Sequence, residues 1–223
     1  IEATQVYPDY TGLGTVRRSL GDLTLLAGSK LNLTLQANKE LARGAVRLTG
    51  STNGLTLDIP LQASGKNPRE FVASLPISSE ALTGFAILLE DKYGFRSKDD
   101  AIYRIDVLPD RAPTVRITYP ERKEELITQR ATVLVGFEAV DDFGIAQLSL
   151  RYTVDGGEEK GVQLVLEGQP QRSLRRRYEW KVGALSPKPP EGSTLEYWIE
   201  ARDNNNVTGP GVGVSERFAA RVV

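Results

Sequence analysis

Hydrophobic and polar residues alternate along most of this chain. In the segment 31–37, apolar residues take every second position and polar side chains take the positions between them. A repeat of two residues is typical of a β-strand that buries one face. The pattern predicts seven strands in the first half, at 23–25, 31–37, 45–48, 55–59, 71–75, 85–89 and 101–107. It predicts seven more in the second half, at 115–117, 132–139, 148–152, 162–166, 174–182, 195–201 and 218–222.

The two halves of the chain repeat each other. The segment 85–91 corresponds to 197–203 at an offset of 112 residues, and the segment 31–37 corresponds to 133–139 at an offset of 102. Because the offsets differ, loops of unequal length separate strands of the same pattern. A strand-rich unit of about 110 residues that occurs twice indicates tandem modules of one fold.

Seven short strands with turn residues between them favour a sandwich of two sheets. The predicted fold class is all-β, with two tandem antiparallel β-sandwiches of the immunoglobulin or fibronectin type III kind. Pro109 and Pro113 mark a stiff boundary, so we expect a sandwich over residues 1–109, a linker over 110–113 and a second sandwich over 114–223. So short a linker predicts domains that stand end to end.

Composition excludes several classes of function. The chain has no cysteine and no histidine, so disulfides, the usual zinc sites and Ser-His-Asp or Cys-His catalysis are excluded. Residues 1–109 contain 12 basic and 12 acidic residues, and residues 112–223 contain 15 and 16. Such a balanced charge argues against nucleic acid as a partner. No run of about 20 apolar residues occurs, so we expect no direct membrane insertion within this segment.

One segment resembles a known domain family. The segment 191–204 is similar to the sixth strand of fibronectin type III and related immunoglobulin-like domains. The similarity rests on Glu191-Gly192-Ser193-Thr194-Leu195-Glu196-Tyr197 and on Ile199, Ala201, Asp203 and Asn204. The resemblance implies that Tyr197 is a corner tyrosine, with its ring in the core and its hydroxyl bonded to the backbone. Phe85 takes this place in the first half, where such a bond is impossible.

A second resemblance covers most of the chain. It rests on Tyr7-Pro8-Asp9-Tyr10-Thr11-Gly12-Leu13, on Ala139-Val140-Asp141-Asp142-Phe143-Gly144-Ile145 and on Ala201-Arg202-Asp203-Asn204. These segments are similar to ones found in large bacterial membrane-anchored proteins of unknown function. The resemblance implies an extracytoplasmic location, periplasmic or on the cell surface, and no assigned activity.

Acidic residues at strand ends raise the question of a metal. Asp141, Asp142 and Asp203 could supply oxygen ligands to Ca²⁺ at one pole of the second domain. The alternative is that they close turns by accepting hydrogen bonds from their own backbone. The first half has lysines at the matching places, and no Asp-x-Asp-x-Asp loop occurs. We therefore expect no cofactor, with calcium as the alternative.

Aromatic residues are the candidates for a ligand or interface. Alternation turns Trp198 away from the core that Tyr197 and Ile199 face, so it could act as a platform for a sugar or as an interface anchor, or pack beneath a loop. Tyr7 and Tyr10 could add to a surface patch.

Charged segments give no catalytic pattern. The run Arg172-Ser173-Leu174-Arg175-Arg176-Arg177 places Arg175 and Arg177 on the outer face of a strand, as a solvated face or an anion site. Adjacent carboxylates point to opposite faces of a strand and cannot cooperate in glycoside hydrolysis. The pairs concerned are Glu90-Asp91, Asp99-Asp100, Glu124-Glu125 and Glu158-Glu159.

The sequence therefore predicts a protein that is not an enzyme. Its expected role is a non-catalytic, extracytoplasmic spacer or interaction segment of a larger bacterial surface or membrane-anchored protein, with the rest of its own chain as partner. The alternative is an adhesin-like module that binds a carbohydrate or a protein ligand.

Overall fold

The computed structural model describes residues 1–21, 23–50, 56–65, 67–78, 81–98 and 101–223. The predicted carboxylate pair Asp99-Asp100 lies outside these residues. The chain divides into two compact units, Ile1–Asp110 and Arg111–Val223. Within the described ranges, the helical elements are two short 3-10 turns, η1 (Asp9–Thr11) and η2 (Val182–Ala184), and the fold is all-β.

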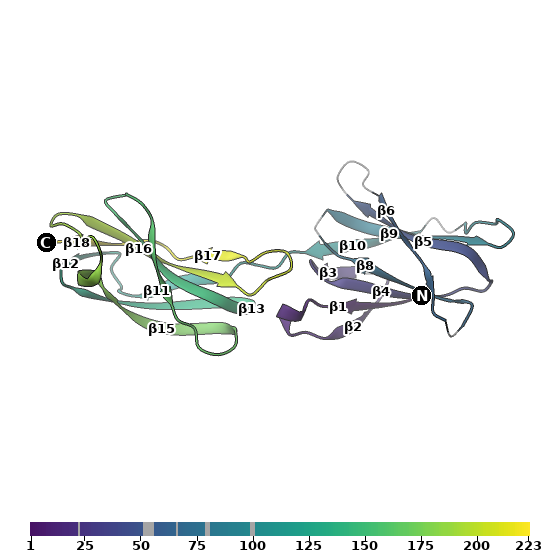
Figure 1. Ribbon diagram of the computed structural model, residues 1–223, viewed down its shortest axis with the longest axis horizontal. Helices are drawn as coiled ribbons and strands as arrows, with labels where there is room; N and C mark the ends of the chain where they lie inside the picture. Colours follow the sequence, from purple (N-terminus) through teal and green to yellow (C-terminus); the bar gives the residue numbers. More distant parts are fainter. Residues whose placement is uncertain (22, 51–55, 66, 79–80, 99–100) are drawn as a thin grey trace. The chain divides into compact units, whose positions relative to one another are not determined.

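Unit 1 is a sandwich of two five-stranded sheets (Figure 1). One sheet has the order β2-β1-β4-β8-β7, and the other has the order β3-β10-β9-β5-β6. The strands of the first sheet are β1 (Glu2–Val6), β2 (Thr15–Arg18), β4 (Lys30–Gln36), β7 (Gln62–Ala63) and β8 (Glu70–Pro76). Those of the second are β3 (Leu23–Leu26), β5 (Leu41–Gly50), β6 (Thr56–Pro60), β9 (Leu82–Asp91) and β10 (Ile102–Leu108).

Unit 2 repeats the central strand order of unit 1 without counterparts of β2 and β7, and its two layers join into one sheet. In one layer, the first part of β13 lies between β11 and β15. The other layer has the order β14, second part of β13, β16, β18 and β12. A short strand, β17, also pairs with β16. The strands are β11 (Thr114–Tyr119), β12 (Glu124–Ile127), β13 (Thr132–Val154), β14 (Lys160–Leu164), β15 (Gln171–Lys181), β16 (Thr194–Asp203), β17 (Val212–Val214) and β18 (Phe218–Val222).

The two layers join because β13 is continuous where two strands were expected. Up to Val140 it pairs with β15, and from Ile145 it pairs with β16. Between these residues the chain bends at Gly144, whose φ of 147° is a value that side chains rarely allow. In unit 1 the same change of sheet takes place across a loop between β4 and β5.

Both cores consist of the residues that alternation turns inward. Leu31, Leu33 and Leu35 are buried in unit 1, and Phe137 and Tyr197 are buried in unit 2. The register of the strands is equivalent in the two units, because Phe85 pairs with Leu48 of β5 and Tyr197 pairs with Tyr152 of β13. Immunoglobulin-like sandwiches place their cores in this way between two alternating faces.

The expected hydroxyl bond of Tyr197 is not found among the described residues. Its ring packs with Trp180 and Phe218, with centroids 5.4 and 6.0 Å away. Burial, together with the charge of Glu125, raises the pKa of the hydroxyl well above its usual value. The ring therefore fills the core as expected, while the bond to the backbone that the resemblance implied is absent from this part of the chain.

Because the Tyr197 hydroxyl does not bond to the backbone of the described residues, we expect Tyr197→Phe to change stability little. Loss of a bonded corner hydroxyl would cost about 0.5–1.5 kcal/mol, because a backbone partner would lose its bond. Without that bond, we expect the free energy of unfolding in urea to change by less than about 0.5 kcal/mol. A loss of more than about 1 kcal/mol would show that the hydroxyl does hold the corner.

Candidate functional site

The outer face of one sheet in unit 2 carries rows of polar side chains. Three strands contribute, because Ser149 of β13 lies between Gln163 of β14 and Glu200 of β16 in the pairing register. Gln147 lies opposite Arg202 in the neighbouring row. Alternation turns these side chains outward, while Leu148 and its neighbours at every second position fill the core.

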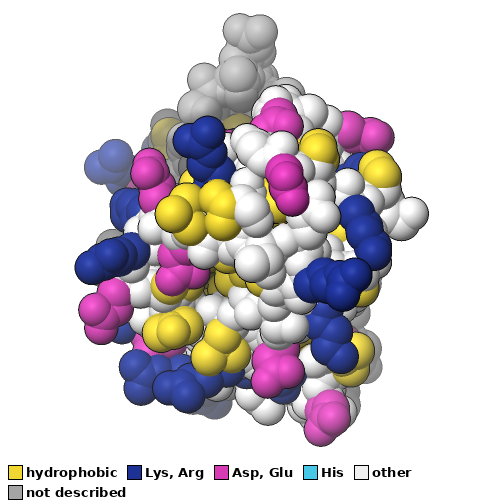
Figure 2. Space-filling view, turned by 90° about the vertical axis from the view of Figure 1, so that its left-hand side faces the viewer, with side chains coloured by type: hydrophobic (Ala, Val, Ile, Leu, Met, Phe, Trp, Pro, Cys, Tyr) yellow, Lys and Arg dark blue, Asp and Glu magenta, His cyan; other side chains and the backbone are white. Residues whose placement is uncertain are grey.

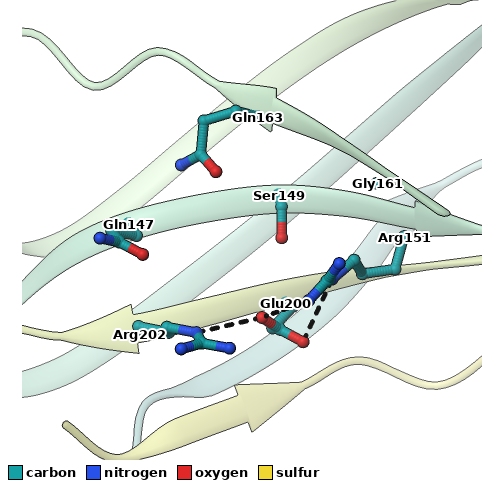
Figure 3. A pocket seen from close by; sticks show the side chains of 7 residues that line it. All are labelled: Gln147, Ser149, Arg151, Gly161, Gln163, Glu200 and Arg202. Carbon is teal, nitrogen blue, oxygen red and sulfur yellow. Dashed lines mark hydrogen bonds and ion pairs between the residues drawn. The ribbon is translucent and has the colours of Figure 1, made fainter. Parts of the chain in front are cut away.

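A groove of about 240 Å³ lies over these rows (Figure 3). It is hollow because two of its lining residues are small, Ser149 in the middle row and Gly161 opposite Arg151. Gly161 also gives room to Arg151, since a Cβ atom at this glycine would lie 2.9 Å from Nη1 of the arginine. The groove is lined by Gln147, Ser149, Arg151, Gly161, Gln163, Glu200 and Arg202.

Ion pairs hold one side of the groove in place. Glu200 accepts from Nε of Arg151 at 3.4 Å and from Nε of Arg202 at 3.2 Å, and Figure 3 shows it between the two arginines. Arg151 also lies 3.5 Å from Glu159. The two positive charges are thus balanced by two negative ones. The groove offers guanidinium, amide and hydroxyl groups for hydrogen bonding and carries little net charge, which suits a neutral polar ligand.

Trp198 borders this face but is not available as a platform. It lies outside the core cluster that contains Tyr197 and Ile199, yet it is only 4% exposed. The guanidinium of Arg217 covers its ring at 4.1 Å from the centroid and also donates to Glu196 at 3.3 Å. Of the alternatives for this outward tryptophan, the structure supports packing beneath a loop, because Arg217, from the segment between β17 and β18, covers the ring as a cation–π partner.

Removal of this arginine has a measurable consequence. In Arg217→Ala we expect the fluorescence of Trp198 to shift to longer wavelength and its quenching by acrylamide to increase, because the ring becomes exposed. The cation–π contact contributes about 0.5–2 kcal/mol to stability. Arg175→Ala, which removes an exposed arginine paired with Glu138, should leave the fluorescence unchanged. An unchanged spectrum in Arg217→Ala would show that other groups cover the ring.

Tyr7 and Tyr10 do not form an exposed aromatic patch. Both are half-buried in unit 1, on the segment between β1 and η1 and in η1 itself. The hydroxyl of Tyr7 accepts from Nη2 of Arg18 at 2.8 Å, and the same guanidinium donates to Gln5. This network fixes the tyrosine to its own sheet, so its role in the structure is to position the first hairpin.

The acidic residues at the strand ends of unit 2 close turns. Asp141 Oδ2 accepts from the backbone N–H groups of Phe143 at 2.9 Å and Gly144 at 2.6 Å. Asp203 accepts from the N–H groups of residues 205 and 211, both at 2.9 Å, and is buried. Burial raises the pKa of Asp203, and the charge of Asp141 raises it further. Asp142 is exposed and stands apart from these bonds.

Within the described ranges, no group of three or more acidic residues is arranged to hold a metal ion. We expect millimolar Ca²⁺ and EDTA to leave the melting temperature unchanged, because the oxygens of Asp203 and one oxygen of Asp141 already accept backbone hydrogen bonds. A ligand that binds only the folded state would raise the melting temperature. A saturable one-to-one Ca²⁺ site in calorimetry, abolished by Asp203→Asn, would contradict this.

The basic strand β15 follows the predicted alternation. Arg175 and Arg177 are exposed, while Arg176 lies at the rim and donates to the carbonyl of Val165 at 2.7 Å. Arg175 pairs with Glu138, which also binds Arg116 and has its carboxyl pKa lowered by that arginine. The run therefore belongs to a paired surface network.

The sequence pattern did not indicate the groove as a site. The signal that could have found it is the polar set at alternate positions of β13, combined with a glycine in β14. Cross-strand register was needed to bring Gln163, Ser149 and Glu200 into one row, and the sequence alone does not provide that register.

No protein-family model matches the chain, and no curated protein matches it. Among solved structures, a bacterial ice-binding adhesin of 1.5 MDa is similar at a TM-score of 0.42 and 11% identity, over 89% of this chain and 61% of that one. A DUF4785 family protein from Legionella pneumophila has a TM-score of 0.33 and 11% identity, over 86% of this chain and 53% of that one. The titin domains Z1Z2, solved with telethonin, have a TM-score of 0.31 and 12% identity over 91% and 92%. These values are too low to carry an argument about function.

Proposed function

We propose that this chain is a non-catalytic, extracytoplasmic segment of a larger surface or membrane-anchored protein, in which its β-sandwiches space or position other parts. The observation that carries the proposal is that its charged surface groups bind one another. Arg47 pairs with Asp58 on one sheet of unit 1, and Glu138 joins Arg116 to Arg175 in unit 2. Such cross-strand pairs stabilise a sheet surface and leave few groups for chemistry.

The surface at the C-terminal end of unit 2 agrees with this role. Figure 2 shows basic and acidic side chains interspersed there, with separate hydrophobic side chains between them. Leu126 of unit 2 is 71% exposed. Single exposed hydrophobic side chains of this kind are normal on protein surfaces and do not by themselves mark a binding site. In the part of the chain that the structure describes, no helix has the length and apolar character needed to cross a membrane.

An exchange experiment in the parent protein tests the spacer role. Replacing residues 1–223 by two unrelated β-sandwich domains of similar length should preserve the function of the parent protein, because a spacer acts through its dimensions. Deletion of the same residues should impair it. If the exchange is as harmful as the deletion, the surface of this segment is recognised and the spacer proposal is wrong.

The groove of unit 2 supports a second candidate function, the binding of a neutral carbohydrate. Side-chain amides, a hydroxyl and a carboxylate held between two arginines match the hydrogen-bonding groups of a sugar. The volume of about 240 Å³ admits a small ligand, below the usual range of about 300–1,000 Å³ for larger ones. The covered position of Trp198 removes the stacking platform that would strengthen such binding.

A groove-filling variant tests this second function. Ser149→Trp should abolish binding to an immobilised oligosaccharide panel, because the new side chain occupies the middle of the groove. Ser173→Trp, on an exposed position of β15, is the matched control and should bind as the unsubstituted chain does. If calorimetry detects no binding of any oligosaccharide at millimolar concentration, the carbohydrate-binding function is wrong and only the spacer role remains.

A further inference from the structure

The turn after β9 presents two strongly exposed aromatic side chains. Tyr93 is 87% exposed and Phe95 is 72% exposed, and one glycine, Gly94, separates them. They lie at the end of unit 1 where β9 ends (Figure 1). Exposed aromatic pairs are costly in water and are enriched where proteins meet partners.

The turn that carries them is rigid. The buried carboxylate of Asp91 accepts from the backbone N–H groups of Tyr93 at 2.9 Å and Phe95 at 3.0 Å. The N–H of Asp91 donates to the carbonyl of Phe95 at 3.0 Å, and Gly94 supplies the left-handed φ of 82° that the turn needs. The aromatic rings are thus presented by a preorganised backbone, which lowers the entropic cost of binding.

An apolar cavity of about 140 Å³ opens at the same end of unit 1. The hairpin contributes to its wall through Leu89 and Ser97, which are hydrogen-bonded to each other. Two of its lining residues, Ile1 and Ala101, are exposed, so the cavity is accessible from solvent. Its apolar wall is formed chiefly by Leu35, Leu41, Phe71, Ile87, Leu89 and Tyr103.

We propose that this end of unit 1 binds a second copy of the chain, with Phe95 of each copy seated in the cavity of the other. An apolar cavity of about 150 Å³ holds one benzene ring, so the cavity is the size of a single phenyl group. Phe95 is the residue that fits, because its ring is wholly apolar. Tyr93 keeps its hydroxyl at the rim, where charged groups surround the turn.

The position of the two features favours a second copy as the occupant. A two-fold contact needs the same patch on both molecules to be complementary to itself, and here the protruding ring and the cavity lie at one end of the unit. Charges of both signs flank the turn, since Lys39 pairs with Asp91 at 3.5 Å and Lys92 pairs with Glu40, so the patch carries no single-sign charge that would repel a second copy.

A lipid surface is the other occupant to test, because binding to anionic lipid depends on lysine and arginine near the membrane. The four basic side chains that flank the turn are all engaged in ion pairs with acidic side chains of the turn and of the neighbouring β4–β5 loop. The apolar fit of ring and cavity, and not the charge, therefore selects a second copy. Four aromatic side chains, two from each copy, bury about 600–1,000 Å² in all, which falls below the roughly 1,200 Å² of a stable interface. We therefore expect a weak, reversible dimer.

Sedimentation of the full 223-residue chain from 10 μM to 1 mM tests the proposal. We expect the mean mass to rise with concentration, and Phe95→Ser to weaken the association at least tenfold. Leu126→Ser removes an equally exposed apolar side chain from unit 2 and should leave it unchanged. Melting temperatures equal to that of the parent chain show that both variants fold.

A complementation experiment identifies the cavity as the receptor. Ala101→Phe adds a ring at the mouth of the cavity and should also weaken self-association. A mixture of Phe95→Ser and Ala101→Phe should associate more strongly than Phe95→Ser alone, because one ring and one open cavity remain in each mixed pair.

Three results would overturn the proposal. The first is a chain that stays monomeric at 1 mM, and the second is a dimer that Phe95→Ser leaves intact. The third is a monomer that co-sediments with vesicles of phosphatidylglycerol and phosphatidylethanolamine and loses this property in Phe95→Ser, which would assign the aromatic pair to a lipid surface.

Discussion

Phe137→Ala should destabilise the chain by about 3–5 kcal/mol, the range found when a buried phenylalanine is truncated. Phe137 is only 1% exposed and lies in the core cluster of unit 2. It sits on the part of β13 that is paired on both sides, with Ile117 of β11 and Arg176 of β15. Because two strands fix this backbone, the cavity left by the missing ring cannot collapse easily.

Urea unfolding followed by far-ultraviolet circular dichroism measures this loss. Val140→Ala is the matched control, since Val140 lies on the same strand but is 53% exposed, and it should cost little. The two units unfold independently if they are thermodynamically separate domains, so the loss should appear in the transition of unit 2. Equal stability of Phe137→Ala and the parent chain would mean that the register of β13 is shifted by one residue.

Alternation predicted the strands that bury one apolar face and missed those that do not. The segment 31–37 was predicted because every inward position of β4 is apolar. The neighbouring strand β1 was missed because its inward positions are the small Ala3 and the polar Gln5, which is fully buried. Its amide donates to Ser29 at 2.9 Å and accepts from Arg18 at 2.8 Å, and those partners are 24 and 13 residues away. Local pattern contains no such information.

The predictions for the candidate sites depended on whether the contacts are local in the sequence. The turn-closing role of Asp141 and Asp203 was predictable because the hydrogen bonds are local, from two or three residues along the chain in most cases. For Trp198 the sequence left the exposed and the covered state open, because Arg217 reaches the ring from 19 residues later. The groove also required three strands in register. The sequence therefore predicted the positions of most strands better than it predicted the surfaces.

Asp203→Ala is the second substitution with a large expected effect. It removes the acceptor of two backbone N–H groups, at residues 205 and 211, and a buried donor without a partner costs about 1–3 kcal/mol. Relief of the buried charge offsets part of this loss, because desolvation raises the pKa of Asp203. We expect a net destabilisation of about 2–4 kcal/mol at pH 7, confined to unit 2.

The pH dependence of this difference follows from the raised pKa. An aspartate whose folded pKa lies above its unfolded value contributes stability that is fully present below the unfolded pKa and is lost as pH rises through the folded pKa. The parent chain should therefore gain stability over Asp203→Ala as pH falls through that window, measured by urea unfolding at several pH values. Asp142→Ala, which removes an exposed neighbouring carboxylate, should show neither the loss nor the pH dependence. If Asp203→Ala matched Asp142→Ala at every pH, the two backbone bonds would have no net role in holding the loop after β16.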